Sequence, residues 1–312
     1  MAPTTDNKII LITRKTRLDE LIARFNTLEQ ARFYIEHSGA DFDDYLNEHE
    51  QYALAVRTAT AHLKTWGQVQ ALDRYFLPNF VFGPRDMVIV LGQDGLVANT
   101  MKYLDGQPVI GVNPEPGRWD GILLPFTVED LAMIVPEALT RKRAIQEVSM
   151  AKATLNDGQV LYGVNDLFIG PRSHTSIRYT IQVGKVRENH SSSGIIVSTG
   201  LGSTGWLKSL VTGAQGIVQA LAGKEIQMQN PTGFAWEADS LYFTVREPFP
   251  SRTSTTDLVF GQITGQNTLL LESKMPEDGV IFSDGIESDF VAFNSGSQAV
   301  IGLAEKKGVM VV

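Results

Sequence analysis

Short apolar runs alternate with segments of helical periodicity along the first 144 residues of the chain. The runs are rich in valine and isoleucine, as in strands buried on both faces, and the intervening segments repeat apolar residues every three or four positions. This alternation predicts an α/β domain with a parallel, Rossmann-like sheet. The predicted strands are Lys8–Thr13, Met87–Leu91 and Pro108–Val112, and the predicted helices are Leu18–Phe25, Leu28–His37, Phe42–Lys64, Leu96–Leu104 and Thr127–Leu139, the last capped by Thr127.

The pattern changes near residue 144, where short β-like runs separated by Gly, Asn, Asp and Ser turns replace the helical periods. We therefore predict an α/β domain over residues 1–144, an all-β sandwich over residues 145–312 and a ligand cleft between them. A helix is predicted to begin near Trp206. The predicted strands are Glu147–Leu155, Val160–Leu161, Asp166–Ile169, Ser176–Val183, Gly194–Ser198, Ser240–Val245, Leu258–Thr264, Thr268–Ser273 and Val280–Ser283.

Composition narrows the functional classes. The chain has 312 residues, of which 43% are hydrophobic and 20% charged, and no apolar run approaches the ~20 residues that cross a bilayer. Its formal charge of -8 argues against a nucleic-acid partner, and the absence of cysteine excludes disulfides and thiolate metal sites. The first six residues show no secretory leader. These features predict a cytoplasmic protein with no membrane or nucleic-acid partner.

The sequence Gly92-Gln93-Asp94-Gly95 stands between the strand Met87–Leu91 and the next helix. The glycines allow a sharp turn that exposes backbone amides at a helix start, where the macrodipole favours phosphate. Asp94 is the carboxylate held at that point. The alternative is a tight connection with a turn-forming aspartate.

Two polar motifs stand out in the second half of the chain. Asn165-Asp166 is set between apolar residues, and its amide and carboxylate suit base edges and ribose hydroxyls, although an Asx turn explains it as well. The segment from Ser198 to Trp206, Ser-Thr-Gly-Leu-Gly-Ser-Thr-Gly-Trp, follows a strand and precedes a helix. Its glycines and hydroxyls predict a second anion-binding helix start, with Trp206 available for stacking.

Two loops follow strands of the predicted parallel sheet. Arg14-Lys15-Thr16-Arg17 is either a phosphate contact or a solvated charged loop. Residues 111–121, rich in proline and glycine, form either a ligand loop or a plain connector. His49 and His62 have no partner at ligand-like spacing, so we expect no metal ligands from the protein.

The ordered set of motifs resembles that of the NAD kinases, which carry Gly-Gly-Asp-Gly-Thr, Gly-Val-Asn, Asn-Glu and Ser-Thr-Pro-Thr-Gly-Ser-Thr-Ala-Tyr. The matching segments here are Gly92–Gly95, Val109–Asn113, Asn165-Asp166 and Gly194–Thr204, and the resemblance covers the chain from about Met87 to Gly205. Arg14–Arg17, the loop after Gly111 and Trp206 look closer to the mitochondrial-type branch.

The resemblance implies transfer of the ATP γ-phosphoryl group to the ribose 2′-hydroxyl of NAD, giving NADP, with Mg²⁺ accompanying ATP (or polyphosphate). Asp94 matches the catalytic aspartate that engages the acceptor hydroxyl. The remaining residues would bind nucleotide: Gly92 and Gly95 face phosphate, Asn165 and Asp166 hold adenine and ribose, and Ser203, Thr204 and Trp206 line the nucleotide site. NAD and ATP are the expected partners, in a homo-oligomer (dimer or tetramer).

Four residues depart from the family pattern. Gln93 replaces the second glycine, Leu96 replaces threonine, Ser193 stands where many members have aspartate, and Leu201 replaces threonine. These departures keep two alternatives open: a catalytically degenerate nucleotide-binding homologue, and a kinase of the same fold acting on a lipid diol or another small hydroxyl compound.

Overall fold

The computed structural model describes residues 8–223 and 233–312, which divide into two compact units. The first unit runs through Gln146 and also contains Val309–Val312, and the second comprises Glu147–Gly308. The first six residues, on which the expectation of no secretory signal rests, lie outside the described residues. No helix in the described ranges combines the length and apolar character needed to cross a bilayer.

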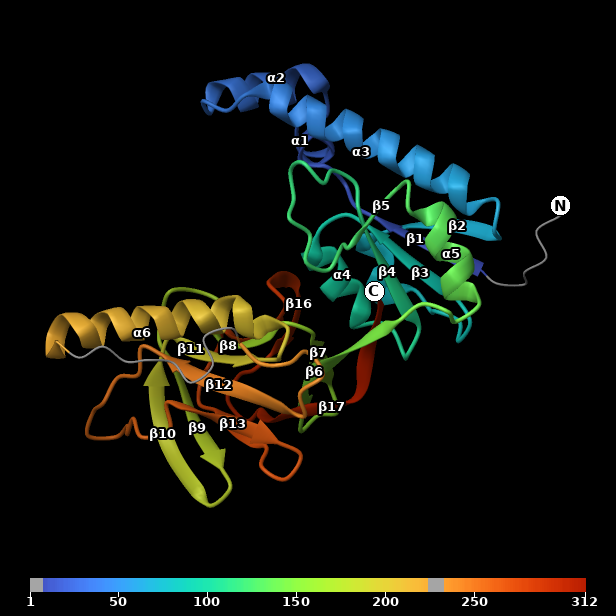
Figure 1. Ribbon diagram of the computed structural model, residues 1–312. Helices are drawn as coiled ribbons and strands as arrows, with labels where there is room; N and C mark the ends of the chain where they lie inside the picture. Colours follow the sequence, from blue (N-terminus) through green and yellow to red (C-terminus); the bar gives the residue numbers. More distant parts are fainter. Residues whose placement is uncertain (1–7, 224–232) are drawn as a thin grey trace. The chain divides into compact units, whose positions relative to one another are not determined.

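The first unit is built on a parallel sheet with strand order β2-β1-β3-β4 (Figure 1). Two short segments pair in parallel with β4, at its two ends. Because these strands are parallel, their carboxyl ends lie at one edge of the sheet. The α/β prediction is confirmed. The strands are β1 (Lys8–Thr13), β2 (Gln68–Asp73), β3 (Met87–Leu91), β4 (Pro108–Asn113), β5 (Phe126–Thr127) and the last residues of β17 (Gln298–Val311).

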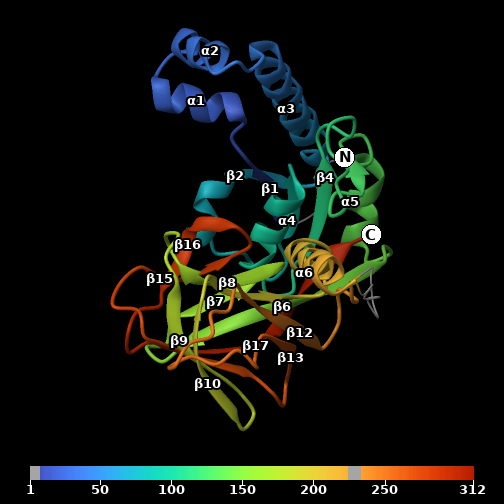
Figure 2. The ribbon, with the colours of Figure 1, turned by 90° about the vertical axis from the view of Figure 1, so that its left-hand side faces the viewer.

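Helices cover this sheet. One face is buried under α3 and α5, whose apolar residues form a continuous core with Ile9, Leu11 and Ile89. Helices α1 and α2 pack against the N-terminal part of α3 through a small core of their own, away from the strands (Figures 1 and 2). The helical segments are α1 (Arg17–Phe25), α2 (Leu28–His37), α3 (Phe42–Leu63), the 3-10 helix η1 (Arg74–Asn79), α4 (Asp94–Met101) and α5 (Leu131–Leu139).

The prediction of a helix beginning at Thr127 is wrong. Phe126–Thr127 forms β5 and pairs with β4, and α5 begins at Leu131. The carboxylate of Asp130 accepts hydrogen bonds from the backbone N–H and the hydroxyl of Thr127, at 2.7 and 2.9 Å. The polar residues that resembled a first helical turn therefore close a strand-to-helix connection.

The second unit contains two sheets. Their inner faces meet in one apolar core that includes Tyr179, Ile195 and Phe243, which confirms the predicted β-sandwich. One sheet has the order β10-β9-β14-β17, with β6 and β7 beyond β17, and the other has the antiparallel order β13-β12-β11-β8-β15-β16. Helix α6 (Trp206–Ala222) follows the 3-10 turn η2 (Gly202–Thr204).

The strands of this unit are β6 (Ile145–Leu155), β7 (Val160–Gly163), β8 (Asp166–Pro171), β9 (Ile177–Val183), β10 (Val186–Ser192), β11 (Gly194–Ser198), β12 (Ser240–Arg246), β13 (Phe260–Thr264), β14 (Leu269–Ser273), β15 (Gly279–Ser283), β16 (Ile286–Ala292) and most of β17.

Candidate functional site

Asp94 is the first residue of α4, at the carboxyl edge of the parallel sheet. Its carboxylate accepts hydrogen bonds from the backbone N–H groups of Leu123 (2.8 Å) and Ile122 (3.2 Å). The side chain is half-buried. These bonds tie the start of α4 to the loop after β4 and fix the orientation of the carboxylate.

A glycine on β4 permits this arrangement. A Cβ at Gly111 would lie 1.9 Å from the carbonyl oxygen of Leu123, so any side chain at that position would displace the residues that hold Asp94. Gly121, at φ 63°, makes the turn that brings Leu123 back onto the strand. Gly92 packs against Leu96, whose Cδ2 lies 2.8 Å from where a Cβ would stand. The backbone N–H of Gly92 donates to the carbonyl of Val112 at 3.2 Å, so this amide does not face a phosphate as the resemblance implied.

A cavity of about 330 Å³ opens at the same edge of the sheet. Residues of the predicted basic loop line this cavity. In all, five cationic and two carboxylate side chains line the cavity, together with Gln93 and Trp119. The charged residues are Arg14, Lys15, Arg17, Arg74, Arg118, Glu20 and Glu48. The sequence alone did not indicate Arg74, which follows β2, whereas Arg118 lies in the loop of residues 111–121 that the sequence offered as either a ligand loop or a plain connector.

Glu48 and Asp44, both on α3, hold three of these arginines in place. Glu48 is 2% exposed and pairs with Arg14 (2.9 Å) and Arg17 (2.5 Å). Burial opposes its ionisation, but the hydrogen bonds from Arg17 and Arg14 outweigh burial and lower the pKa of Glu48. Asp44 accepts from Arg118 and Arg17, which lower its pKa to about 2.

The second unit carries the Asn165-Asp166 pair at the start of β8. Asp166 is half-buried, and desolvation of its carboxyl raises its pKa to about 7; a hydrogen bond from Ser198 acts in the opposite direction, and the charge of Asp284 raises the pKa further. Among the described residues nothing hydrogen-bonds the side-chain amide of Asn165, which is half-buried. A carboxyl with a strongly raised pKa, next to a side-chain amide without a hydrogen-bond partner among the described residues, marks a candidate binding site.

Sequence reasoning missed Asp284, which organises this pair. Its carboxylate Oδ1 accepts from three consecutive backbone N–H groups, those of Val164 (2.9 Å), Asn165 (2.6 Å) and Asp166 (3.2 Å). Asp284 lies in the turn between β15 and β16, with φ 53°. The neighbouring Gly285 is the signal of a turn there, but nothing in the sequence links that turn to a motif 119 residues away.

The glycines and hydroxyls that follow β11 form a compact turn against the backbone of Val164 and Asn165, which immediately precede β8. Thr199 donates its hydroxyl to the carbonyl of Val164 (2.5 Å), and a Cβ at Gly202 would lie 2.1 Å from the carbonyl oxygen of Asn165. Ser203 donates to the carbonyl of Gly200 (2.6 Å) and accepts from the N–H of Phe234 (3.2 Å). Its hydroxyl therefore supports the turn.

Thr204 and Trp206 lie beyond this turn. Thr204 is exposed, and Trp206, 38% exposed, stacks on Phe168 with ring centroids 5.7 Å apart. The guanidinium of Arg246 lies 5.6 Å from the indole ring. The aromatic surface predicted for Trp206 is thus part of a cation-π stack within the second unit.

The departures from the family pattern occupy different surroundings. Gln93 lines the basic cavity, whereas Leu96 and Leu201 are buried. Ser193 lies at the opposite end of β11 from Ser198 and donates to the carboxylate of Glu247. The change at Ser193 is therefore remote from the Asp166 pair.

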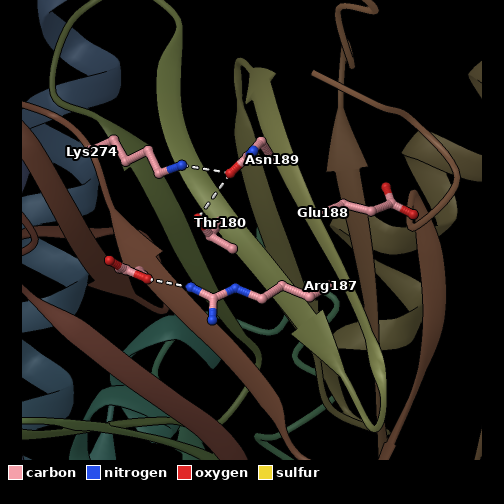
Figure 3. A pocket seen from close by; sticks show the side chains of 6 residues that line it. Thr180, Arg187, Glu188, Asn189 and Lys274 are labelled. Carbon is pink, nitrogen blue, oxygen red and sulfur yellow. Dashed lines mark hydrogen bonds and ion pairs between the residues drawn. The ribbon is translucent and has the colours of Figure 1, made fainter. Parts of the chain in front are cut away.

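A second cavity, of about 310 Å³, lies on β9, β10 and β14 (Figure 3). Lys274 and Thr180 converge on Asn189, Arg187 pairs with Glu272, and Glu188 points away toward His190. Its charges balance, so it lacks the character of an anion site. Across the described ranges, three or more His, Cys, Asp or Glu side chains nowhere gather in a metal-binding group.

No protein-family model matches the chain. It is 34% identical over 129 residues to an NAD kinase of Heliobacterium modesticaldum, a match that covers 39% of this chain and 44% of the relative. It is 31% identical over 143 residues to NAD kinase 1 of Trichormus variabilis, covering 40% and 46%. The chain thus spans less than half the length of these curated relatives.

Two solved structures match almost the whole chain. The NAD kinase from Archaeoglobus fulgidus in complex with ATP has a TM-score of 0.54 at 14% identity, covering 98% of this chain and 93% of that structure. The yeast NADH kinase complexed with NADH has a TM-score of 0.58 at 13% identity, covering 99% and 84%. The chain therefore has the fold of the NAD kinases.

Proposed function

We propose that the chain is an NAD kinase, which transfers the γ-phosphoryl group of ATP to the 2′-hydroxyl of the adenosine ribose of NAD. The observation that carries this proposal is the position of Asp94: a carboxylate at the start of α4, held by two backbone amides at the carboxyl edge of a parallel sheet. Ligands of open α/β sheets bind at that edge. The names of the curated relatives and the matched structures support the same activity.

Asp94 acts on the acceptor hydroxyl. Its oxygens are oriented by the amides of Ile122 and Leu123, and a carboxylate fixed in this way accepts the hydroxyl proton as the oxygen attacks phosphorus. The N–H groups of the first turn of α4, at Asp94 and Gly95, lack i−4 partners and suit phosphate oxygens. The hydroxyl proton goes to Asp94, and ADP leaves with the bridging oxygen.

Asn165 and Asp166 bind the dinucleotide. The free amide of Asn165 offers both a donor and an acceptor to adenine, and Asp166 accepts from, or when protonated donates to, a ribose hydroxyl. Asp284 fixes the backbone beneath both residues. Thr204 and Trp206 complete the nucleotide-binding group, while Ser203 supports their turn.

We expect Mg²⁺ to accompany the ATP donor. Ions of this kind bind mainly through substrate phosphates with few protein ligands. When bound, the ion offsets the charge that develops on the phosphoryl oxygens.

We assign the chain to the mitochondrial-type branch on the basis of Arg14–Arg17, the loop after Gly111 and Trp206, and we expect a homo-oligomer. The experiment that tests the function is an assay of purified protein with ATP, Mg²⁺ and NAD, in which NADP is measured. A homologue that binds nucleotide without chemistry would bind NAD and yield no NADP.

A further inference from the structure

The basic cavity of the first unit gathers residues that follow four parallel strands. Arg14 follows β1, Arg74 follows β2, Gln93 follows β3, and Arg118 lies in the loop after β4. These positions are separated widely in the sequence but share one edge of the sheet, because the strands are parallel. Five cations against two carboxylates give the lining a positive charge in a chain whose net charge is -8.

Arg14 carries an unused donor in this cavity. Its side chain is 8% exposed, one terminal nitrogen bonds Glu48 at 2.9 Å and the other bonds the carbonyl of Lys15 at 3.0 Å, yet the buried Nε–H has no partner in the described part of the chain. A buried donor without a partner costs about 1–3 kcal/mol, so its retention indicates a ligand that accepts the bond.

Two further cations are available. Lys15 and Arg74 are exposed, and neither makes an ion pair with any residue in the described ranges. Three cationic groups around one cavity, one of them with an unpaired donor, suit a ligand with several adjacent negative charges.

We propose that this cavity binds the phosphate chain of a polyphosphate, the group shared by a nucleoside triphosphate and inorganic tripolyphosphate, through Arg14, Lys15 and Arg74. Its identification as the site of the phosphoryl donor rests on the proposed function, whereas the binding itself does not. The cavity of about 330 Å³ holds a short phosphate chain and leaves Trp119 at its wall.

Glu48 is a positioning residue for this site. It lies on α3 and fixes the guanidinium groups of Arg14 and Arg17 without facing the solvent. Tyr52 completes the support: its hydroxyl accepts from the backbone N–H of Arg14 and donates to the carbonyl of Leu91, both at 2.9 Å. Arg14 is therefore held in place before a ligand arrives.

The test measures calorimetric binding of tripolyphosphate, ATP and adenosine to the full chain. We expect tripolyphosphate and ATP to bind and adenosine not to bind at this site. The double variant Lys15→Gln/Arg74→Gln should weaken tripolyphosphate binding by at least about tenfold, because two charge-assisted contacts are lost from exposed positions that contribute little to folding.

The matched control is Lys185→Gln/Arg252→Gln, which removes the same charge from exposed positions of the second unit. It should leave tripolyphosphate affinity unchanged. Quenching of Trp119 fluorescence by tripolyphosphate, lost in Trp119→Phe, locates the ligand in the cavity.

Three results would overturn the proposal: no binding of tripolyphosphate, equal weakening in both double variants, or binding of ATP that is unaffected by Lys15→Gln/Arg74→Gln. The activity assay separates this proposal from the proposed function. If tripolyphosphate binding depends on Lys15 and Arg74 but no NADP forms, the anion site stands and the kinase assignment fails.

Discussion

The carboxylate of Asp94 accepts a hydrogen bond of 2.8 Å from the backbone N–H of Leu123, 29 residues further along the chain. This bond joins the Gly92–Gly95 connection to the loop after β4, so both loops adopt one arrangement together. A carboxylate whose orientation is fixed by backbone amides acts on a substrate hydroxyl without a conformational search. The proposed reaction therefore depends on Leu123 and on the glycine beneath it, as well as on Asp94.

Asp94→Asn tests the acid-base role. We expect turnover to fall by at least about a hundredfold, because the amide cannot take up a proton, while the fold persists at a cost of about 1 kcal/mol for the weakened bond. NADP formation and thermal unfolding measure the two effects. Turnover equal to that of the unmodified chain would leave Asp94 as a turn residue alone.

Gly111→Ala tests the positioning of Asp94 without changing a reacting group. The added methyl would meet the carbonyl oxygen of Leu123 at 1.9 Å and push the residues after Gly121 away from Asp94. We expect at least a tenfold loss in kcat. Gly117→Ala is the control in the same loop, because no atom lies within 4 Å of its Cβ position. Similar activities of the two variants would contradict this role of Gly111.

Asp166 makes stability depend on pH in an unusual direction for a carboxyl. Its native pKa of about 7 lies above the ordinary value of 3.8, so the native state binds the proton more tightly than the unfolded state. Stability should then fall as pH rises from about 4 to 7 and stay level above that range.

Asp166→Asn should remove this fall. Relative to the unmodified chain, the variant should gain on the order of 1–4 kcal/mol in unfolding free energy between pH 5 and pH 8. Urea unfolding at several pH values measures the difference. Parallel pH profiles for the two proteins would show that the carboxyl of Asp166 is not held protonated.

Leu96→Thr restores the hydroxyl of the family pattern beside the Gly92–Gly95 connection. Leu96 is 6% exposed, so the change should cost about 1–3 kcal/mol of stability, while a new hydrogen bond to phosphate raises the rate by up to about tenfold. Leu104→Thr, at a position 2% exposed near the end of α4, should lose stability with no gain in rate. A rate that drops in both variants would argue against a phosphate near residue 96.

In the first unit, apolar patterning sufficed for the buried strands β1, β3 and β4 and missed the exposed strand β2; in the second unit it also missed β10, β16 and β17. β1, β3 and β4 are continuous apolar runs and were predicted within a residue or two. β2, Gln-Val-Gln-Ala-Leu-Asp, is the outermost strand of the sheet, and its glutamines are exposed, so it has no continuous apolar run to indicate a strand. Because β2 was missed, Arg74 could not be placed beside Arg14.

The site residues also divide into features that the sequence reveals and features that it does not. Motifs adjacent in sequence, such as Asn165-Asp166, were identifiable because their chemistry is local. The contacts that give them their properties come from residues far away in the sequence. The carboxylate of Asp284 accepts from the backbone N–H of Asn165, and the backbone N–H of Phe234 donates to the hydroxyl of Ser203, which the resemblance assigned to nucleotide. Such pairings depend on strand register, which one sequence does not reveal.

The measurement that tests the account most directly is NADP formation by the purified chain with ATP, Mg²⁺ and NAD. We predict NADP that accumulates in proportion to time and enzyme concentration, and that falls at least about a hundredfold in Asp94→Asn. Absence of NADP after long incubation at high enzyme concentration, with NAD binding still detected by calorimetry, would contradict the account and identify a nucleotide-binding protein without kinase chemistry.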